Sequence, residues 1–272
     1  MITGIDSAVA KVIRATEHLD AINRLIGSLT SSTEAYKIIK DADGKETINF
    51  LVDPPPHVAI LAGEIIYQLR SAIDHLTYDL VKLNPSGIRL PSGWERRCDF
   101  PLWLRIPDEQ IRCGHANPPL PFNCFAKTLP GISKTAFSFI EGMQPYRTGE
   151  GHHNVMAIIA KLSNIDKHRH LNAILPRVAV RQDFKSARGL NSTSIVGGFT
   201  HGAEVHNVIM TRGCGEDPTV DMKRTFLQYV TFDEPAIGAG PASLEAQNVL
   251  EVCTQTVKSV VIPAFIQLLK NP

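Results

Sequence analysis

Apolar residues recur at helical spacing in five stretches of the chain. Two long ones run from Ile5 to Leu29 and from His57 to Leu83, and two shorter ones cover Ile132–Met143 and His152–Leu171. Ser243–Leu269 closes the chain with the same periodicity. Residues three and four positions apart share one face of a helix, so each stretch predicts an amphipathic helix.

Strand signals lie between these helices. Two β-rich runs, Tyr36–Ile39 and Ile48–Val52, flank Asp43-Gly44, which is typical of a β-hairpin. Proline is tolerated at the start of a helix, so Pro54-Pro55-Pro56 ends the hairpin and opens the next helix. Ile174–Phe232 predicts further strands between Gly-rich turns, at Val178–Val180, Ser194–Val196, Val205–Met210 and Phe226–Phe232.

Together these elements predict one α+β domain over residues 1–272. We expect an antiparallel helical bundle of four to five helices with an N-terminal β-hairpin and a small antiparallel sheet. The expected parts are a helical core at 1–83 and 132–172 with the hairpin at 34–52, a Pro/Gly-rich excursion at 84–131, a β-rich insertion at 173–233, and a C-terminal helix at 241–270. Aromatic side chains should anchor the excursion: Phe100, Trp103, Phe122 and Phe125.

Composition adds little to this picture, because 43% apolar and 20% charged residues are ordinary for a globular chain. A net charge of +1 provides no general attraction to nucleic acid or membrane. The stretch 161–188 carries seven Lys and Arg residues against two Asp. A solvated basic edge and a polyanion-binding surface both fit this stretch.

The cysteines point to a reducing compartment. They are odd in number and form no disulfide pattern: Cys98, Cys113, Cys124, Cys214 and Cys253. Cys98, Cys113, His115 and Cys124 lack the close Cys-x-x-Cys spacing of a zinc site, so we expect no metal or other cofactor.

No apolar signal segment opens the chain, and Lys258 and Pro263 interrupt the apolar stretch Val257–Leu269. We predict a cytoplasmic protein without a membrane segment.

The second long helix carries its polar and titratable side chains on one face. At about 100° per residue, one arc of about 160° holds Arg70, Asp74, Tyr67, Tyr78, Ser71, Glu64, His75 and Gln68. The opposite arc is almost entirely Leu, Ile and Ala. Solvated faces carry Lys, Glu and Gln more often than Tyr, so we expect another surface to cover this one.

A second polar cluster ends the helix His152–Leu171. Asp166 and Arg169 fall within its apolar stripe. A carboxylate there is costly unless it is paired, so we expect the two helices to pack and Asp166 to be buried beside a cation. Arg169 and Arg70 are the candidate partners. If the cluster has no functional role, it would be an internal ion pair that holds the two helices together.

The segments Gln68–Leu76, with its Arg70-x-x-x-x-His75 spacing, and Asn164–Arg169 resemble the signature helices of HEPN-like proteins. These are small helical bundles of prokaryotic toxin–antitoxin and phage-defence systems. The resemblance covers the two helices and implies a metal-independent endoribonuclease that works as a homodimer, opposed in the cell by an antitoxin protein. Arg70 and His75 would be the catalytic pair, supported by Ser71, Asp74, Tyr67, Tyr78, Asp166 and Arg169.

These residue types suit the reaction. Histidine is a base near neutral pH for the 2′-OH of RNA, and arginine stabilises the developing phosphorane charge, which leads to a 2′,3′-cyclic phosphate. One pair lacks an acid for the leaving group, so His75 of a second subunit would supply it, with Tyr67 or Tyr78 at the dimer interface.

Two other interpretations remain open. In one, the same face of a non-catalytic HEPN-like fold binds a nucleotide, RNA or protein. In the other, Arg70 and His75 are structural residues of an unrelated α+β protein. The sequence lacks the pair of Glu-x-x-His motifs that a di-iron bundle needs, and it lacks His-Glu-x-x-His, P-loop and Gly-x-Ser-x-Gly motifs, which argues against the enzyme classes that carry them.

Overall fold

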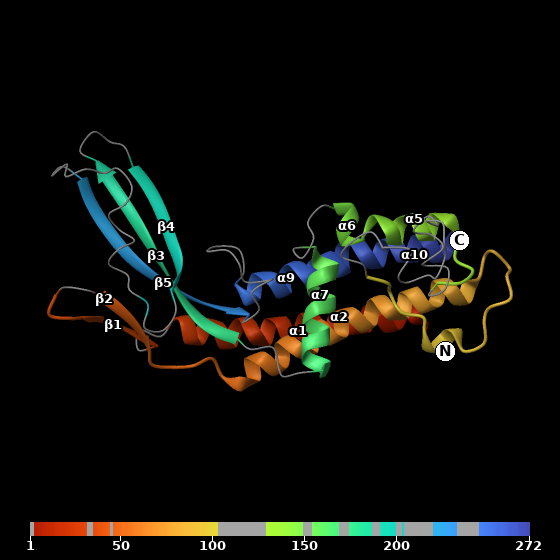
Figure 1. The fold of residues 1–272 in the computed structure, drawn as a ribbon, viewed down its shortest axis with the longest axis horizontal. Coiled ribbons are helices and arrows are strands. Elements are labelled where there is room, and N and C mark those ends of the chain that lie inside the picture. The colour runs from red at the N-terminus through yellow and green to blue at the C-terminus, as the bar shows by residue number, and fades with distance from the viewer. Residues whose placement is uncertain are drawn as a thin grey trace, which may run out of the picture. The chain divides into compact units, whose positions relative to one another are not determined.

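A computed structural model of the chain describes residues 3–31, 35–43, 46–102, 129–148, 154–168, 174–186, 191–199, 203, 220–232 and 245–272. It is a mixture of helix and sheet and is mostly helical (Figure 1). The predicted combination of helices with antiparallel strands is therefore confirmed, and the internal contacts of the chain divide it into two compact units. The first unit comprises Met1–Asp20, Ile60–Asn172 and Leu250–Pro272, and the second comprises Ala21–Ala59 and Ala173–Val249.

Helix α1, Gly4–Thr30, begins at a reciprocal cap. The backbone N–H of Asp6 donates to Thr3 Oγ1 at 3.1 Å, and the Thr3 N–H donates back to the Asp6 carboxylate at 3.1 Å. This arrangement satisfies donors that the first turn of a helix leaves unpaired. The hydrogen bonds to Thr3 lower the pKa of Asp6, so the cap is charged at neutral pH.

Helix α2, Pro56–Leu83, matches the predicted helix to within one residue. Its apolar face is the centre of the first unit, and these side chains are at most 5% exposed: Leu61, Ala62, Ile65, Ile66, Leu69, Ala72, Ile73, Leu76 and Leu80. Within that unit α1 lies beside α2 in the opposite direction, because Ser7 contacts His75 whereas Lys11 contacts Gln68.

The shorter helices of the first unit are α5, Lys134–Gly142, α6, Pro145–Thr148, and α7, Val155–His168. The prediction that α7 starts at His152 is wrong, because the Asn154 side chain accepts a hydrogen bond from the Met156 N–H at 2.9 Å and caps the helix there. The predicted packing of α7 on α2 is confirmed at Gly63. A Cβ on this glycine would lie 2.5 Å from Asp166 Oδ1, so the two helices approach closely at this point.

The C-terminal helix is continuous but not uniform. It comprises α9, Ala246–Thr256, a π-helical turn at Val257–Val261, and α10, Ile262–Lys270. Ala246–Lys270 is the one helix in the described ranges that is long and apolar enough to cross a membrane, with 44% of its most apolar window buried inside the protein. Core helices meet the same criterion, so this is weak evidence for a membrane span.

The second unit contains both sheets. Strands β1, Tyr36–Lys40, and β2, Glu46–Phe50, pair antiparallel with Ile38 opposite Ile48, which confirms the hairpin. A three-stranded antiparallel sheet has the order β4-β3-β5, from β3, Ile174–Ser186, β4, Asn191–Phe199, and β5, Val220–Phe232. Ile48 and Val178 are fully buried together. The predicted strand Val205–Met210 lies outside the described residues.

The Pro/Gly-rich excursion is described at its two ends only. Phe100 is 1% exposed and anchors the first end, as predicted, after a short 3-10 helix at Trp94–Arg96. Trp103, Phe122 and Phe125 lie outside the described residues.

Candidate functional site

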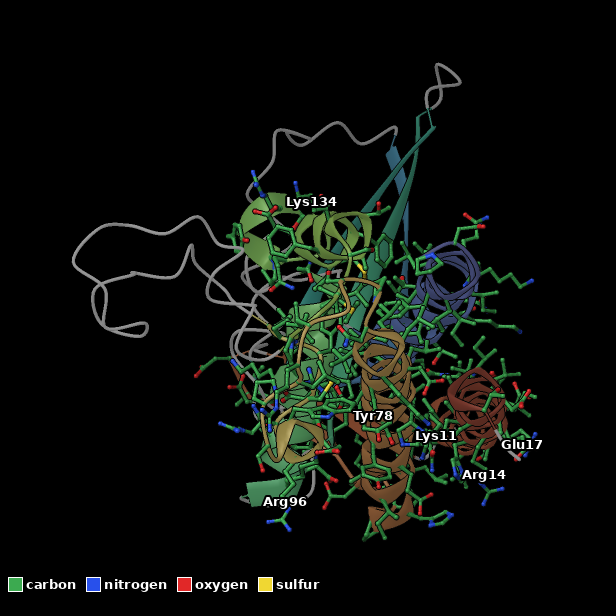
Figure 2. All side chains as sticks on the ribbon, turned by 90° about the vertical axis from the view of Figure 1, so that its right-hand side faces the viewer. Lys11, Arg14, Glu17, Tyr78, Arg96 and Lys134 are labelled. Atoms are coloured by element: carbon green, nitrogen blue, oxygen red, sulfur yellow. The ribbon has the colours of Figure 1, made fainter. Side chains whose placement is uncertain are left out.

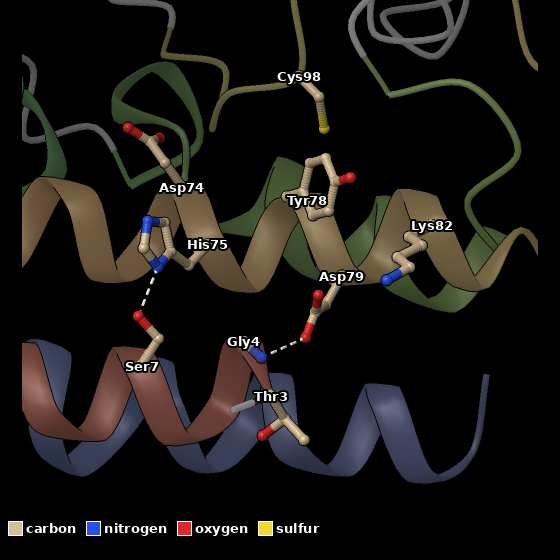
Figure 3. Close-up of a pocket in the computed structure, with 9 residues that line it drawn as sticks. All are labelled: Thr3, Gly4, Ser7, Asp74, His75, Tyr78, Asp79, Lys82 and Cys98. Atoms are coloured by element: carbon tan, nitrogen blue, oxygen red, sulfur yellow. Dashed lines mark hydrogen bonds between the residues drawn. The ribbon is translucent and has the colours of Figure 1, made fainter. Parts of the chain in front are cut away.

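Two cavities lie along the polar side of α2, both within the first unit. The first has a volume of about 500 Å³ and is called the His75 cavity (Figure 3). Its lining comes from the start of α1, the C-terminal half of α2 and the excursion: Thr3, Gly4, Ser7, Asp74, His75, Tyr78, Asp79, Lys82 and Cys98. The second has a volume of about 400 Å³ and is called the Arg70 cavity. It is lined by Arg70, Asp74, Asp99, Phe100, Pro101, Leu102, Ala160, Ser163, Asn164 and Lys167.

Arg70 and His75 therefore face different cavities. Five residues correspond to about 500° of helical rotation, so the two side chains diverge by about 140° around α2. Asp74 lines both cavities and lies between them. The sequence places Arg70 and His75 on one broad face, and the structure separates them within that face.

Arg70 is bonded on three sides within its own chain. Its side chain is 13% exposed, and its Nε lies 3.2 Å from Asp74 Oδ2. Its terminal nitrogen donates to the Phe100 carbonyl at 2.8 Å and lies 3.6 Å from Asp99 Oδ2. The Phe100 N–H donates to Asp74 Oδ1 at 2.9 Å. Arg70 and Asp74 together attach the excursion to α2.

Gln144 continues this attachment from the other side. Its buried side-chain amide donates to the Pro101 carbonyl at 2.9 Å and to the Ile140 carbonyl at 3.0 Å. The backbone of residues 100–101 is thus held from both α2 and the end of α5. Extended chain with buried polar groups needs such partners, so these contacts have a structural purpose.

His75 is held from α1. Its Nδ1 lies 2.8 Å from the Ser7 hydroxyl, and its Nε2 lies 3.5 Å from the hydroxyl of Ser71, one turn back on α2. Burial and the positive charge of Lys11 lower the pKa of His75, although Asp74 and Asp79 act in the opposite direction. The imidazole is therefore neutral at pH 7 and can act as a hydrogen-bond acceptor or a base.

The start of α1 forms one wall of the His75 cavity. The Gly4 N–H donates to the Asp79 carboxylate at 2.9 Å, so a negative charge lies at the positive end of the helix (Figure 3). Sequence reasoning missed Ser7, Asp79 and Lys82. Ser7 is 68 residues from His75 along the chain, and no local spacing indicates such a contact.

The two tyrosines of the polar face have different surroundings. Tyr78 stacks on Trp94, with ring centroids 5.0 Å apart and an interplanar angle of 21°. Tyr67 is 50% exposed, with the Lys11 ammonium 5.6 Å from its ring centroid. Figure 2 shows Tyr78 on α2 and Lys11 on the neighbouring α1, whereas Arg14 and Glu17 lie on the outer side of α1. Other parts of the same chain therefore cover much of this polar face.

Asp166 does not form the predicted pair with Arg70, because Arg70 is bonded to Asp74 and Phe100 instead. Asp166 is half-buried, and its Oδ1 is buried without a hydrogen-bond partner among the described residues. Burial raises the pKa of this carboxyl, against the effect of Lys167. The expected ion pair between Asp166 and Arg70 is therefore wrong, and Asp166 is half-buried rather than largely buried. The other candidate partner, Arg169, lies outside the described residues.

Cys98 projects towards Tyr78 in the His75 cavity (Figure 3). Burial and the carboxylates of Asp99 and Asp74 raise the pKa of its thiol to about 12, so it is protonated and a weak nucleophile. No cluster of three or more His, Cys, Asp or Glu side chains suited to a metal occurs in the part of the chain that the structure describes. Cys113, His115 and Cys124 lie outside it.

Comparisons with known protein families, curated proteins and solved structures found no match for this chain. The chemistry of the two cavities is therefore the basis for any functional inference.

Proposed function

We propose that the chain is a HEPN-like module that binds a nucleotide in the His75 cavity and does not cleave RNA. The separation of Arg70 from His75 carries this proposal. Metal-independent cleavage needs a base and a free cation at the same phosphate. In this chain the Arg70 guanidinium is bonded to Asp74 and to the Phe100 carbonyl in another cavity.

The His75 cavity suits a nucleotide in size and in chemistry. Its volume of about 500 Å³ falls in the usual range of small-molecule sites, roughly 300–1,000 Å³. Lys82 supplies a cation for a phosphate. The Asp79 carboxylate, which also lines the cavity, can accept hydrogen bonds from ribose hydroxyls or from the amino group of a base. The ring of Tyr78 adds an aromatic surface for a base.

The same proposal includes the fold. α1, α2, α5, α7 and the C-terminal helix would form the four- to five-helix antiparallel bundle of HEPN-like proteins. Support comes from the opposite directions of α1 and α2 and from the close approach of α7 at Gly63. A cytoplasmic location belongs to this proposal too.

A metal-independent endoribonuclease is the second candidate, and the neutral His75 favours it. A base with a lowered pKa, held by Ser7 and facing an open cavity, suits removal of the 2′-OH proton. The cation and the acid would then come from a second copy of the chain, which requires a homodimer. Tyr67, at 50% exposure, is available for such an interface, and an antitoxin protein would oppose the activity.

Nucleotide binding can be followed through Trp94, because Tyr78 lines the cavity and stacks on this indole. The chain has two tryptophans, so the Trp103→Phe variant leaves Trp94 as the sole tryptophan, which is excited selectively at wavelengths that tyrosine does not absorb. Titration with AMP, GMP, CMP and UMP should change its fluorescence in a saturable way for at least one of them. In this background Lys82→Gln should weaken binding about ten-fold, since it removes a charge-assisted contact. Lys134→Gln, on the exposed face of α5, should leave binding unchanged. Equal affinities of the two variants, or no saturable change with any nucleotide, would overturn the proposal.

Cleavage is tested separately with a single-stranded RNA in the presence of EDTA. The first candidate predicts intact RNA with the wild type. Cleavage that survives EDTA, disappears in His75→Ala and leaves a 2′,3′-cyclic phosphate would establish the ribonuclease and exclude the first candidate.

A further inference from the structure

The Arg70 cavity has its own chemistry, which the nucleotide proposal does not use. Three parts of the first unit enclose it: α2 contributes Arg70 and Asp74, α7 contributes Ser163, Asn164 and Lys167, and residues 99–102 form the third wall. The Asn164–Lys167 part of this wall comes from the second polar cluster of the sequence.

Ser163 is the unusual residue of this cavity. It is 4% exposed and lines the cavity, and no hydrogen bond to its hydroxyl is found among the described residues. Its oxygen is not one of the fully buried side-chain atoms without a partner, which among the described residues are Asn84 Oδ1 and Asp166 Oδ1, so it can be reached from the cavity. The helix backbone around Ser163 does not provide a hydrogen-bond partner, so the hydroxyl is available to a ligand in the cavity.

Two cations line the same cavity. The Arg70 side chain is 13% exposed, and Arg70 is fixed in position by Asp74 and by the Phe100 carbonyl. Lys167 is exposed on α7 and forms no hydrogen bond or ion pair among the residues that are described. Burial raises the pKa of Asp99, and the charges of Arg70 and Lys167 oppose that shift. A guanidinium, an ammonium and a hydroxyl that line one cavity form the donor set that oxyanions prefer.

The two carboxylates of the cavity do not prevent anion binding. Both oxygens of Asp74 are already occupied, one by the Phe100 N–H and the other by Arg70 Nε. Asp99 is 62% exposed and lies 3.6 Å from Arg70, so it can turn to solvent when an anion approaches the guanidinium.

We propose that the Arg70 cavity is a second ligand site that binds the oxyanion group of a small molecule, a terminal phosphate or a carboxylate. Arg70 and Lys167 neutralise the anion, and the Ser163 hydroxyl donates a hydrogen bond to it. This site does not depend on the proposed function of the His75 cavity, because His75 and Lys82 do not line it.

Isothermal titration of the full chain tests the site with two separate probes: inorganic phosphate and acetate. We expect saturable binding of phosphate or acetate, and the stronger of the two identifies the preferred oxyanion. Ser163→Ala and Lys167→Gln should each weaken it about ten-fold, the usual effect of losing a hydrogen bond to a charged group. Lys161→Gln, on the same helix but outside the cavity lining, should change affinity by less than about two-fold. Lys82→Gln should also leave this binding unchanged, which separates the outcome from that of the His75 cavity.

Thermal unfolding of the ligand-free Ser163→Ala protein tests whether the Ser163 hydroxyl stabilises the fold rather than binding a ligand. A hydroxyl without a partner adds nothing to the fold, so the midpoint should stay the same or rise. A lower midpoint would mean that the hydroxyl is bonded within the protein, and would overturn the proposal. Failure of phosphate and acetate to bind the wild type, or binding by Ser163→Ala and Lys167→Gln that is as strong as that of the wild type, would overturn it as well.

Discussion

Arg70 and Asp74, one helical turn apart on α2, bind the two backbone polar groups of the same residue, Phe100. The Arg70 guanidinium donates a hydrogen bond to the Phe100 carbonyl at 2.8 Å, and the Asp74 carboxylate accepts one from the Phe100 N–H at 2.9 Å. An exposed pair at this spacing contributes only about 0.3–0.5 kcal/mol. Here the pair also fixes a distant segment of chain, so its loss should cost more.

Asp74→Asn should lower the free energy of unfolding by about 1.5–3 kcal/mol, the range for hydrogen bonds that involve a charged group. The variant keeps the shape of the side chain but removes the charge that neutralises Arg70. Urea denaturation measures the difference. Glu17→Gln is the control, because Glu17 pairs with Arg14 at 57% and 59% side-chain exposure and should cost less than about 1 kcal/mol. Similar losses in both variants would show that the attachment of Phe100 contributes little.

His75 should make stability depend on pH in one direction. Its pKa in the folded chain lies below the value of about 6.5 expected in the unfolded chain. As the pH falls below about 6.5, the unfolded state takes up the proton first, and the folded state loses stability until the pH passes the folded-state pKa. Above that window His75 is neutral in both states and contributes no pH dependence.

His75→Asn should reduce this loss, because asparagine can bond to Ser7 without titrating. Unfolding is measured from pH 5 to pH 8 for the wild type, for His75→Asn and for the control His57→Asn, whose histidine is exposed. If His57→Asn flattens the profile as much as His75→Asn does, another histidine or the net charge is responsible.

Asp166→Asn should leave the protein at least as stable at pH 7. The raised pKa of Asp166 means that ionisation is less favourable in the folded chain, so a stabilising contribution present below about pH 3.8 is lost as the pH rises through the folded-state pKa. Asparagine removes that penalty, and its advantage should shrink as the pH falls towards 4. A buried pair with Arg169 predicts the opposite, a loss of about 3–5 kcal/mol, which urea denaturation at pH 7 would reveal.

Gly63→Ala and Gly27→Ala form a matched pair of helical substitutions. A Cβ at Gly27 meets nothing within 4 Å among the described residues, so alanine there should stabilise α1 by up to about 1 kcal/mol. At Gly63 the added methyl would meet Asp166 Oδ1 at 2.5 Å, and this contact should cancel the gain. Combining Gly63→Ala with Asp166→Ala should restore it. An equal gain at both glycines would disprove the close approach of α7 to α2.

The elements that sequence reasoning located well are those with local signals. α2 was predicted to within one residue because Pro56 starts it and an unbroken apolar stripe defines its core face. The hairpin followed from Asp43-Gly44 between two β-rich runs. The start of α7 was misplaced because His152 and His153 fit the helical pattern, and only the cap at Asn154 determines where the helix begins.

The candidate site depends on contacts that no local pattern contains. A helical wheel places Arg70 and His75 on one face, but it does not show that residues 98–102 and the start of α1 pack on that face and separate it into two cavities. Asp166 illustrates a related limit. The wheel places it correctly towards α2, yet the residue that it meets there is Gly63 rather than a cation.

The π-helical turn at Val257–Val261 changes the angle around the helix axis at which the later residues of the C-terminal helix project. Cys253, Val257, Val261 and Phe265 are spaced by four residues and are all fully buried. In a regular α-helix each step of four rotates by about 40° past a full turn, so the last would lie about 120° from the first. A π turn takes in an extra residue and sets the rotation back by about 100°. The wider turn therefore cancels most of the accumulated rotation, and residues spaced by four along this helix stay on the side that faces the core.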